Sequence, residues 1–173
     1  LSIRMPDTRA VSQNWEAHCG VQTAVAHADT YPLHASQYGP ALGRLIDGGR
    51  GLSGMDYQRI LLEAQRFTGQ LEMLLYELDL LLAPVQPYAA PTHEQLSSLA
   101  LDPGANRRLI QFTAPFNVSG HPCISLPIGL TEGGLPIGGQ FIGRKGGEAT
   151  LCRAGMAVQR VSDWHRLRPQ RLK

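Results

Sequence analysis

Residues 123–143, C-I-S-L-P-I-G-L-T-E-G-G-L-P-I-G-G-Q-F-I-G, carry the clearest structural pattern in the second half of the chain. Residues 123–128 and 137–142 are short apolar runs of the length that strands favour. Between them, Thr131 and Glu132 precede Gly133 and Gly134, which can adopt the positive φ that tight turns require. Pro127 indicates an edge position because proline cannot donate to a strand ladder. The sequence therefore predicts a hairpin.

Helical patterns lie on both sides of this hairpin. Residues 148–164 form the last expected helix, with a buried stripe of Leu151, Ala154, Val158 and Val161. The strongest pattern, residues 53–78, begins with Ser53 as a cap and Asp56 three residues on. Its apolar residues recur at three and four and include Tyr57, Ile60, Leu61, Ala64, Phe67, Leu71, Leu74, Leu75 and Leu78. Residues 80–83, closed by Pro84, are expected to form a strand buried on both faces.

The first third of the chain is expected to be helical after a polar start without a clear period. One helix is predicted over residues 15–29, ended by the Thr30-Tyr31-Pro32 sequence. A second is predicted over residues 37–47 and stopped by Gly48-Gly49. Residues 86–106 are rich in Pro, Ser and Thr and are expected to form a surface connection, with a short helix at 93–100. Helices and strands together place the chain in the α/β class.

Composition limits the classes of protein to consider. The chain has 173 residues, 43% hydrophobic and 17% charged, with a net charge of +2. This is enough for one ordinary globular domain, without a strongly basic arm for nucleic acid or an apolar run long enough to cross a membrane. Cys19, Cys123 and Cys152 form no CxxC pair, so a reducing, cytoplasmic setting is expected. The start at Leu1 indicates a piece of a longer protein or a processed product.

The residues alone offer no evident active site. Ser125 lies in a predicted strand, and no G-x-S-x-G elbow occurs. The two lysines, Lys145 in a glycine turn and Lys173 at the end, are expected to be solvated rather than buried as a base. The six histidines show no metal-ligand spacing, and the neighbours His18-Cys19 and His121-x-Cys123 favour core or surface roles over a catalytic pair.

Two further features have ordinary structural explanations. The glycines at 138–139, 143 and 146–147 do not follow the order of a phosphate-binding loop, and hairpin turns explain them better. At 138–139 they weaken the strand or permit a close approach of backbones. Arg107-Arg108 could hold an anion but is expected in an exposed turn. No metal or cofactor is expected.

Three stretches of the chain form an ordered set of motifs. They are A-H-A-D-T-Y-P at 26–32 followed by Y-G-P at 38–40, then Y-E-L-D-L-L-L-A-P at 76–84, and then F-T-A-P-F-N-V-S-G-H-P-C-I-S-L-P at 112–127. The last continues through G-L-P-I-G-G-Q at 134–140 to Gly143-Arg144, and is followed by E-A-T-L at 148–151 and D-W-H at 163–165. In this order and spacing the motifs resemble those of the amidase signature enzymes, and the resemblance covers about residues 15–169.

The resemblance implies a large α/β fold with a mixed sheet flanked by helices, of which residues 1–173 are expected to be the C-terminal portion of a single domain. Family members hydrolyse linear carboxamides, or move ammonia from them, with a Ser–cis-Ser–Lys triad and a glycine-rich oxyanion loop. The Gly/Ser-rich block is absent from these 173 residues, and neither lysine matches. No catalytic residue is therefore assigned in this chain, which is expected to be inactive alone.

What remains for this segment is scaffold and pocket wall. Phe112, Thr113, Phe116 and Asn117 are the candidates for the wall of the substrate pocket, with a purely structural role as the alternative. Ala83 and Val85 lack the hydroxyls that family members often carry around the proline that here is Pro84.

Several interpretations of the function stay open. A hydrolase is favoured over the amidase-family component of the tRNA-linked glutamyl amidotransferase, because Ile110 and Gln111 stand where that component usually has an acidic residue. A non-catalytic scaffold or interaction module is the other alternative. The expected partners are a small-molecule amide in the complete enzyme and a missing N-terminal half or a second copy, with no nucleic acid and no membrane.

Overall fold

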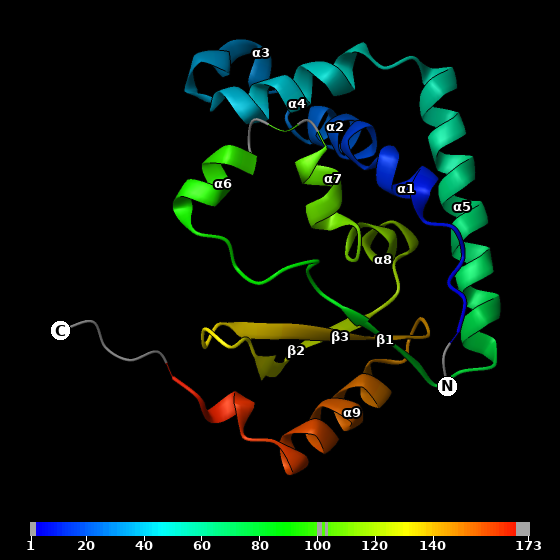
Figure 1. Cartoon of the computed structure of the whole chain (residues 1–173). Helices are drawn as coiled ribbons and strands as arrows, with labels where there is room; N and C mark the ends of the chain where they lie inside the picture. The colour runs from blue at the N-terminus through cyan, green and yellow to red at the C-terminus, as the bar shows by residue number, and fades with distance from the viewer. Residues whose placement is uncertain (1–2, 100–101, 103, 169–173) are drawn as a thin grey trace. The chain divides into compact units, whose positions relative to one another are not determined.

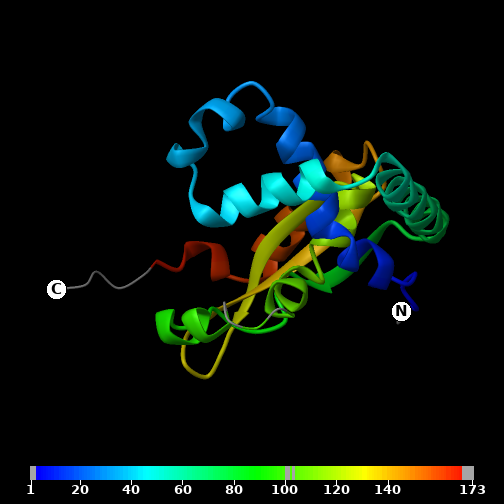
Figure 2. The same ribbon diagram turned by 90° about the horizontal axis from the view of Figure 1, so that it is seen from above.

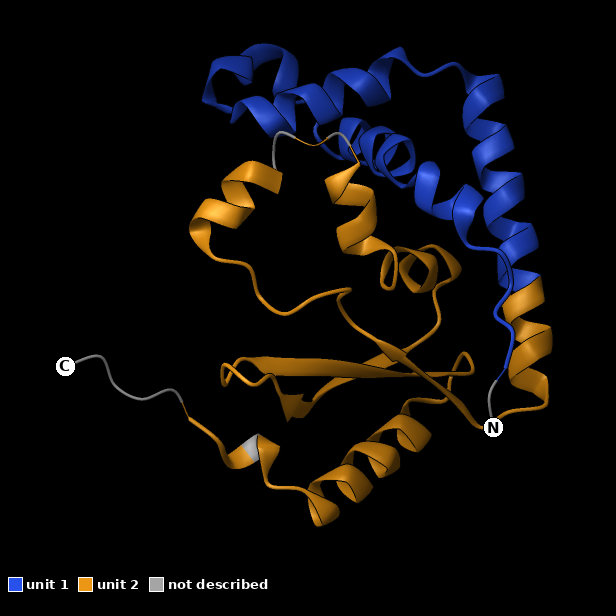
Figure 3. Cartoon of the chain, viewed as in Figure 1, with its two compact units in different colours: residues 1–69 blue, residues 70–173 orange. Residues whose placement is uncertain are grey.

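The computed structural model describes residues 3–99, 102 and 104–168, without the side chain of His165. The chain divides into two compact units, residues 1–69 and residues 70–173 (Figure 3). The division falls within the long helix α5 (Gly54–Tyr76).

The first unit is helical in its described part. It contains α1 (Arg9–Gln13), α2 (Trp15–Ala26), α3 (Tyr31–His34), the 3-10 turn η1 (Ala35–Gln37), α4 (Pro40–Gly51) and most of α5. The short α1 was not predicted. The expected helix at 15–29 is confirmed as α2, and the chain leaves it before Pro32, which sits in the first turn of α3.

Helices α2 and α4 lie side by side (Figures 1 and 2) and meet through two glycines. A Cβ atom on Gly49 would lie 2.0 Å from the carbonyl oxygen of Gly20, so only backbone fits between the helices there. The prediction that Gly48-Gly49 stops this helix was wrong, because α4 runs on to Gly51. Here the glycine serves close packing rather than termination.

Helix α5 matches its predicted start and most of its buried stripe. The backbone N–H of Asp56 donates to Ser53 Oγ at 3.0 Å, which confirms the cap. Phe67, Leu71 and Leu75 are buried along one side. The helix ends at Tyr76, two residues before the predicted Leu78.

The second unit contains an antiparallel sheet of β1 (Leu80–Pro84), β2 (Cys123–Leu130) and β3 (Pro136–Gly143), in the order β1-β3-β2. The hairpin of β2 and β3 is confirmed, and Gly134 takes the expected positive φ of 79° in its turn. The α/β class is confirmed too. In β1, Leu81 is buried, whereas Leu82 is 65% exposed. The two side chains point to opposite faces of the sheet, so one face is covered at this point. Burial of residues 80–83 on both faces was expected of the complete sheet and stays a prediction.

Helices lie on both sides of this sheet: α9 (Glu148–Val161) on one side and α8 (Ala114–Ser119) on the other (Figure 1). The remaining elements are α6 (His93–Leu99), α7 (Ala105–Ile110) and η2 (Trp164–Arg166). The short helix expected at 93–100 is confirmed over its described residues, while α7 and α8 were not predicted. Leu151 of α9 is buried as expected, but Val161 is 85% exposed because it ends the helix.

The C-terminus of α5 is held by a side chain from the end of β3. Arg144 donates from Nε to the carbonyl of Leu75 at 2.7 Å and from Nη2 to those of Tyr76 and Leu78 at 3.1 and 3.2 Å. These carbonyls include helix acceptors that have no intrahelical partner. Among the described helices, none is long and apolar enough to cross a membrane.

Candidate functional site

The four predicted wall residues lie in and just before α8, in three different environments. Phe116 is 5% exposed and belongs to the core. Phe112 and Thr113 are half-buried, and the Thr113 hydroxyl donates to the carbonyl of Ile110 at 3.3 Å. Asn117 is exposed. Of the four, Asn117 thus presents the most accessible polar group, and Phe116 fills a structural role in this unit.

The position of this segment depends on Gln140, a buried residue of β3. Gln140 is only 3% exposed, and its Nε2 donates to the carbonyls of Pro84 at 2.9 Å and Phe112 at 2.6 Å. One amide therefore joins the end of β1 to the turn that leads into α8. A primary amide suits this task because it carries two N–H donors on one atom. Gln140 belongs to the motif at 134–140, and no role was predicted for it from the sequence.

A groove opens beside this junction, with a volume of about 830 Å³. Its walls are the segment after β1, residues 84–91, and the β2–β3 hairpin, with Leu109 and Leu96 adding apolar surface. Val85 donates its N–H to the carbonyl of Gly138 at 3.1 Å, which fixes the start of that segment against β3. Ser125 and Thr131 bring hydroxyls to a lining that is otherwise largely apolar. None of the four predicted wall residues lines this groove.

Ser119 and His121 form a buried pair at the end of α8. Ser119 Oγ lies 2.9 Å from His121 Nδ1 and also donates to the carbonyl of Phe116 at 3.2 Å. Burial lowers the pKa of His121, and the charge of Lys145 lowers it further, against a smaller opposite effect of Glu72. The imidazole is therefore neutral near pH 7. Because Ser119 is 3% exposed and its hydroxyl is engaged, this pair is not an accessible nucleophile and base.

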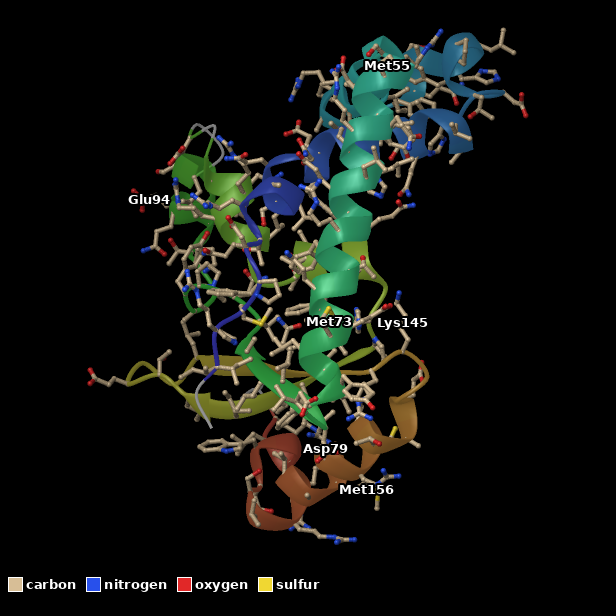
Figure 4. The ribbon with its side chains drawn as sticks, turned by 90° about the vertical axis from the view of Figure 1, so that its right-hand side faces the viewer. Met55, Met73, Asp79, Glu94, Lys145 and Met156 are labelled. Atoms are coloured by element: carbon tan, nitrogen blue, oxygen red, sulfur yellow. The ribbon has the colours of Figure 1, made fainter. Side chains whose placement is uncertain are left out.

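Lys145 lies beside the C-terminal part of α5 (Figure 4) and pairs with Glu72, with Nζ and Oε1 2.8 Å apart. Both side chains are about half exposed, so the expectation that Lys145 is solvated is confirmed. The hydrogen bond from Lys145 lowers the pKa of Glu72. This lysine is a surface cation rather than a buried base. Lys173 lies outside the described residues.

The other candidates for chemistry also have structural roles. Ser125 is a strand residue, as expected. Burial raises the pKa of the Cys123 thiol to about 11, so the nucleophilic thiolate form is scarce near pH 7. Arg107 and Arg108 lie in α7 rather than in an exposed turn, and Arg108 pairs with Asp102. The described residues thus contain no assembled nucleophile and base.

The described residues form helices and a small antiparallel sheet, and they bring no nucleophile and base together. The family model for amidases matches residues 8–152. The chain is 47% identical over 149 residues to "Putative amidase AmiD" of Mycobacterium tuberculosis, covering 86% of this chain and 31% of that protein. It is 37% identical to a component of the glutamyl-tRNA(Gln) amidotransferase of Chloroflexus aurantiacus, covering 77% of this chain and 28% of the relative.

Solved structures agree with these relatives. 6-Aminohexanoate cyclic dimer hydrolase in complex with substrate superimposes with a TM-score of 0.81 and 25% identity, covering 98% of this chain and 39% of that one. A bacterial aryl acylamidase of the amidase signature family gives 0.69 and 23%, covering 93% and 35%. The chain belongs to the amidase family. It spans about a third of the length of the curated relatives it matches.

Proposed function

We propose that these residues form the C-terminal portion of an enzyme that hydrolyses small carboxamides. The observation that carries this proposal is the 47% identity to the AmiD relative across 86% of the chain. It is supported by the motifs at 112–127 and 134–140, which here build α8, the hairpin and the Gln140 junction between them. In this interpretation the segment supplies scaffold and part of the pocket wall.

The reacting groups of the proposed enzyme lie outside these 173 residues. A serine of a Ser–cis-Ser–Lys triad attacks the amide carbonyl, ammonia or an amine leaves with a proton, and water then releases the carboxylic acid from the acyl-enzyme. The ion-paired Lys145 and the buried Ser119 support this placement, because neither has the environment of a triad member. The chain alone is accordingly proposed to be inactive.

The Gln140 junction gives the segment before α8 a fixed position, which a pocket wall requires. Phe112 accepts the shorter of the two hydrogen bonds from Gln140 through its carbonyl, and Asn117 lies one turn into the helix that follows. We propose Asn117 and the half-buried Phe112 and Thr113 for the wall, with Phe116 supporting them from the core.

A second candidate function is amide-dependent transfer within a larger assembly, as in the glutamyl-tRNA(Gln) amidotransferase relatives. The 37% identity to the relative from Chloroflexus aurantiacus favours it, but the identity to the AmiD relative is higher. Ile110 and Gln111, in place of an acidic residue, also favour the hydrolase.

A chimera tests the proposal. The part of the AmiD relative that precedes the matched segment is joined to this chain, and ammonia release is measured with amides that intact AmiD hydrolyses and with glutamine. We expect no release by the chain alone and release by the chimera. Hydrolysis by the chain alone, abolished by a serine-directed inhibitor, would contradict the external triad. A folded chimera without activity contradicts the hydrolase, and a chimera active on glutamine alone supports the transfer function instead.

A further inference from the structure

The first unit contains a pocket that the proposed amidase function does not use. It has a volume of about 310 Å³ and lies among α2, α3 and α4. Its walls are mostly apolar, with Val21 and Ala24 from α2 and Ile46 from α4. Gly49, at the contact of α2 and α4, leaves backbone instead of a side chain in the lining. The volume is at the lower end of small-molecule sites, about 300–1,000 Å³, and suits a ligand of about ten non-hydrogen atoms.

Three polar residues line the same pocket, and two of them are already fixed by the protein. Tyr31 is nearly buried, and its hydroxyl donates to Asp47 Oδ2 at 3.0 Å, which raises the pKa of the phenol. His27 Nδ1 lies 3.0 Å from the hydroxyl of Tyr38, which also lies 2.7 Å from Thr30 Oγ1. These contacts hold both rings in place and leave His27 Nε2 without a partner in the described part of the chain.

The third polar residue, Arg50, supplies a positive charge. It lies in the last turn of α4, lines the pocket, and has no ion pair with any of the described residues. Its charge acts on the Tyr31 hydroxyl, where it opposes the effect of Asp47. The nearest acid on the same helix, Asp47, accepts the Tyr31 hydroxyl, and Asp29 is exposed in the turn after α2. Arg50 is an exposed residue, so the edge of this apolar pocket carries a positive charge, which complements an apolar anion.

We propose that this pocket binds a small carboxylate with an apolar body. The carboxylate pairs with Arg50, and the apolar part lies between α2 and α4. The inference does not rest on the proposed function, because it uses only residues of the first unit. It is measured as binding, so the absence of amidase activity does not affect it.

The test uses phenylacetate and its neutral, nearly isosteric analogue phenylacetamide, with calorimetry and ligand-observed NMR on the full chain. We expect saturable binding of phenylacetate and at least tenfold weaker binding of phenylacetamide, as for the loss of one charge-assisted hydrogen bond. Arg50→Gln should weaken the binding of phenylacetate about tenfold and leave the binding of phenylacetamide unchanged. Asp47→Asn keeps a hydrogen-bond acceptor for Tyr31 and should strengthen phenylacetate.

Matched variants separate the pocket from general effects. Arg44→Gln changes a cation of α4 that does not line the pocket and should not alter binding. Ala28→Leu fills an exposed edge of the pocket and should abolish binding, whereas Ala26→Leu, nearby and outside the lining, should not. Unfolding curves confirm that each variant is folded. Equal binding of the two probes, no saturable binding, or unchanged affinity in folded Arg50→Gln overturns the proposal.

Discussion

Different kinds of contact stabilise the interior of each of the two units. In the first, α2 and α4 touch through Gly20 and Gly49, where no side chain intervenes. In the second, polar side chains join the elements: the buried Gln140 ties β1 to the turn before α8, and the exposed Arg144 caps α5. The contact in the first unit depends on glycines, which place no side chain between the helices. The junctions in the second unit depend on side-chain N–H donors that reach several carbonyls.

This difference determines what each unit tolerates. A close helix contact fails when atoms are added, because the backbones cannot separate without losing the packing on either side. A polar junction fails when a donor is removed, because the carbonyls it served stay buried without a partner.

Adding one methyl group at the helix contact should be the most damaging change. Gly49→Ala places a Cβ 2.0 Å from the Gly20 carbonyl oxygen, and we expect a loss of about 3 kcal/mol in the free energy of unfolding. Urea denaturation measures it. The matched control is Gly48→Ala, where nothing lies within 4 Å of the added atom, and a gain of up to about 1 kcal/mol is expected. Equal effects at the two positions would show that the helices do not touch at Gly49.

Removing the Gln140 donor in the second unit should lower the free energy of unfolding by less than Gly49→Ala does. Gln140→Leu keeps the approximate volume but leaves the carbonyls of Pro84 and Phe112 without this donor, so a loss of about 2 kcal/mol is expected. Ser125→Ala, at the cross-strand partner of Gln140, changes an exposed side chain and should stay within about 0.5 kcal/mol. In hydrogen exchange, amides of α8 should lose protection in Gln140→Leu and keep it in the control. Unchanged protection contradicts the positioning role.

The helix cap is expected to contribute about 1 kcal/mol, since part of the guanidinium is exposed. Arg144→Ala removes donors to three carbonyls at the end of α5. Arg144→Lys should recover only part of the loss, because an ammonium does not reproduce the planar fork of donors. Lys145→Ala breaks an exposed ion pair and should have a smaller effect than Arg144→Ala. If Arg144→Lys is as stable as the parent protein, a positive charge alone is sufficient to cap the helix.

The smallest effect is a pH dependence from His121. Its pKa is lowered in the folded state by burial, so protons bind the unfolded chain more readily as pH falls below the ordinary value near 6.5. The contribution of His121 to the free energy of unfolding is therefore complete above that pH and should decline from about pH 7 toward pH 5. His121→Asn should flatten this profile, although His18, whose pKa is also lowered by burial, leaves part of it. Parallel profiles for the two proteins contradict the assignment.

Much of the fold could be predicted from local patterns. The hairpin at 123–143 follows from two apolar runs around a glycine turn, and the start of α5 follows from Ser53 and Asp56, because these signals act between residues close in sequence. The family could be recognised from the order of motifs at 112–127 and 134–140. The wall residues Phe112, Thr113, Phe116 and Asn117 remain a prediction, since their ligand-facing role depends on residues outside this chain.

The strands, the long helices and the family follow from the order of residues along the chain, because hydrophobic period, turn chemistry and motif order do not depend on how the elements pack. Three features depend on the packing of the elements: Gly49 packs a helix instead of ending it, Leu82 is exposed while Leu81 is buried, and Gln140 joins two carbonyls 56 and 28 residues away. A glycine has the same local freedom in both roles, and an amide has the same donors on a surface or in a core. What distinguishes these roles is which distant backbone comes within contact distance, and that is fixed only when the elements pack.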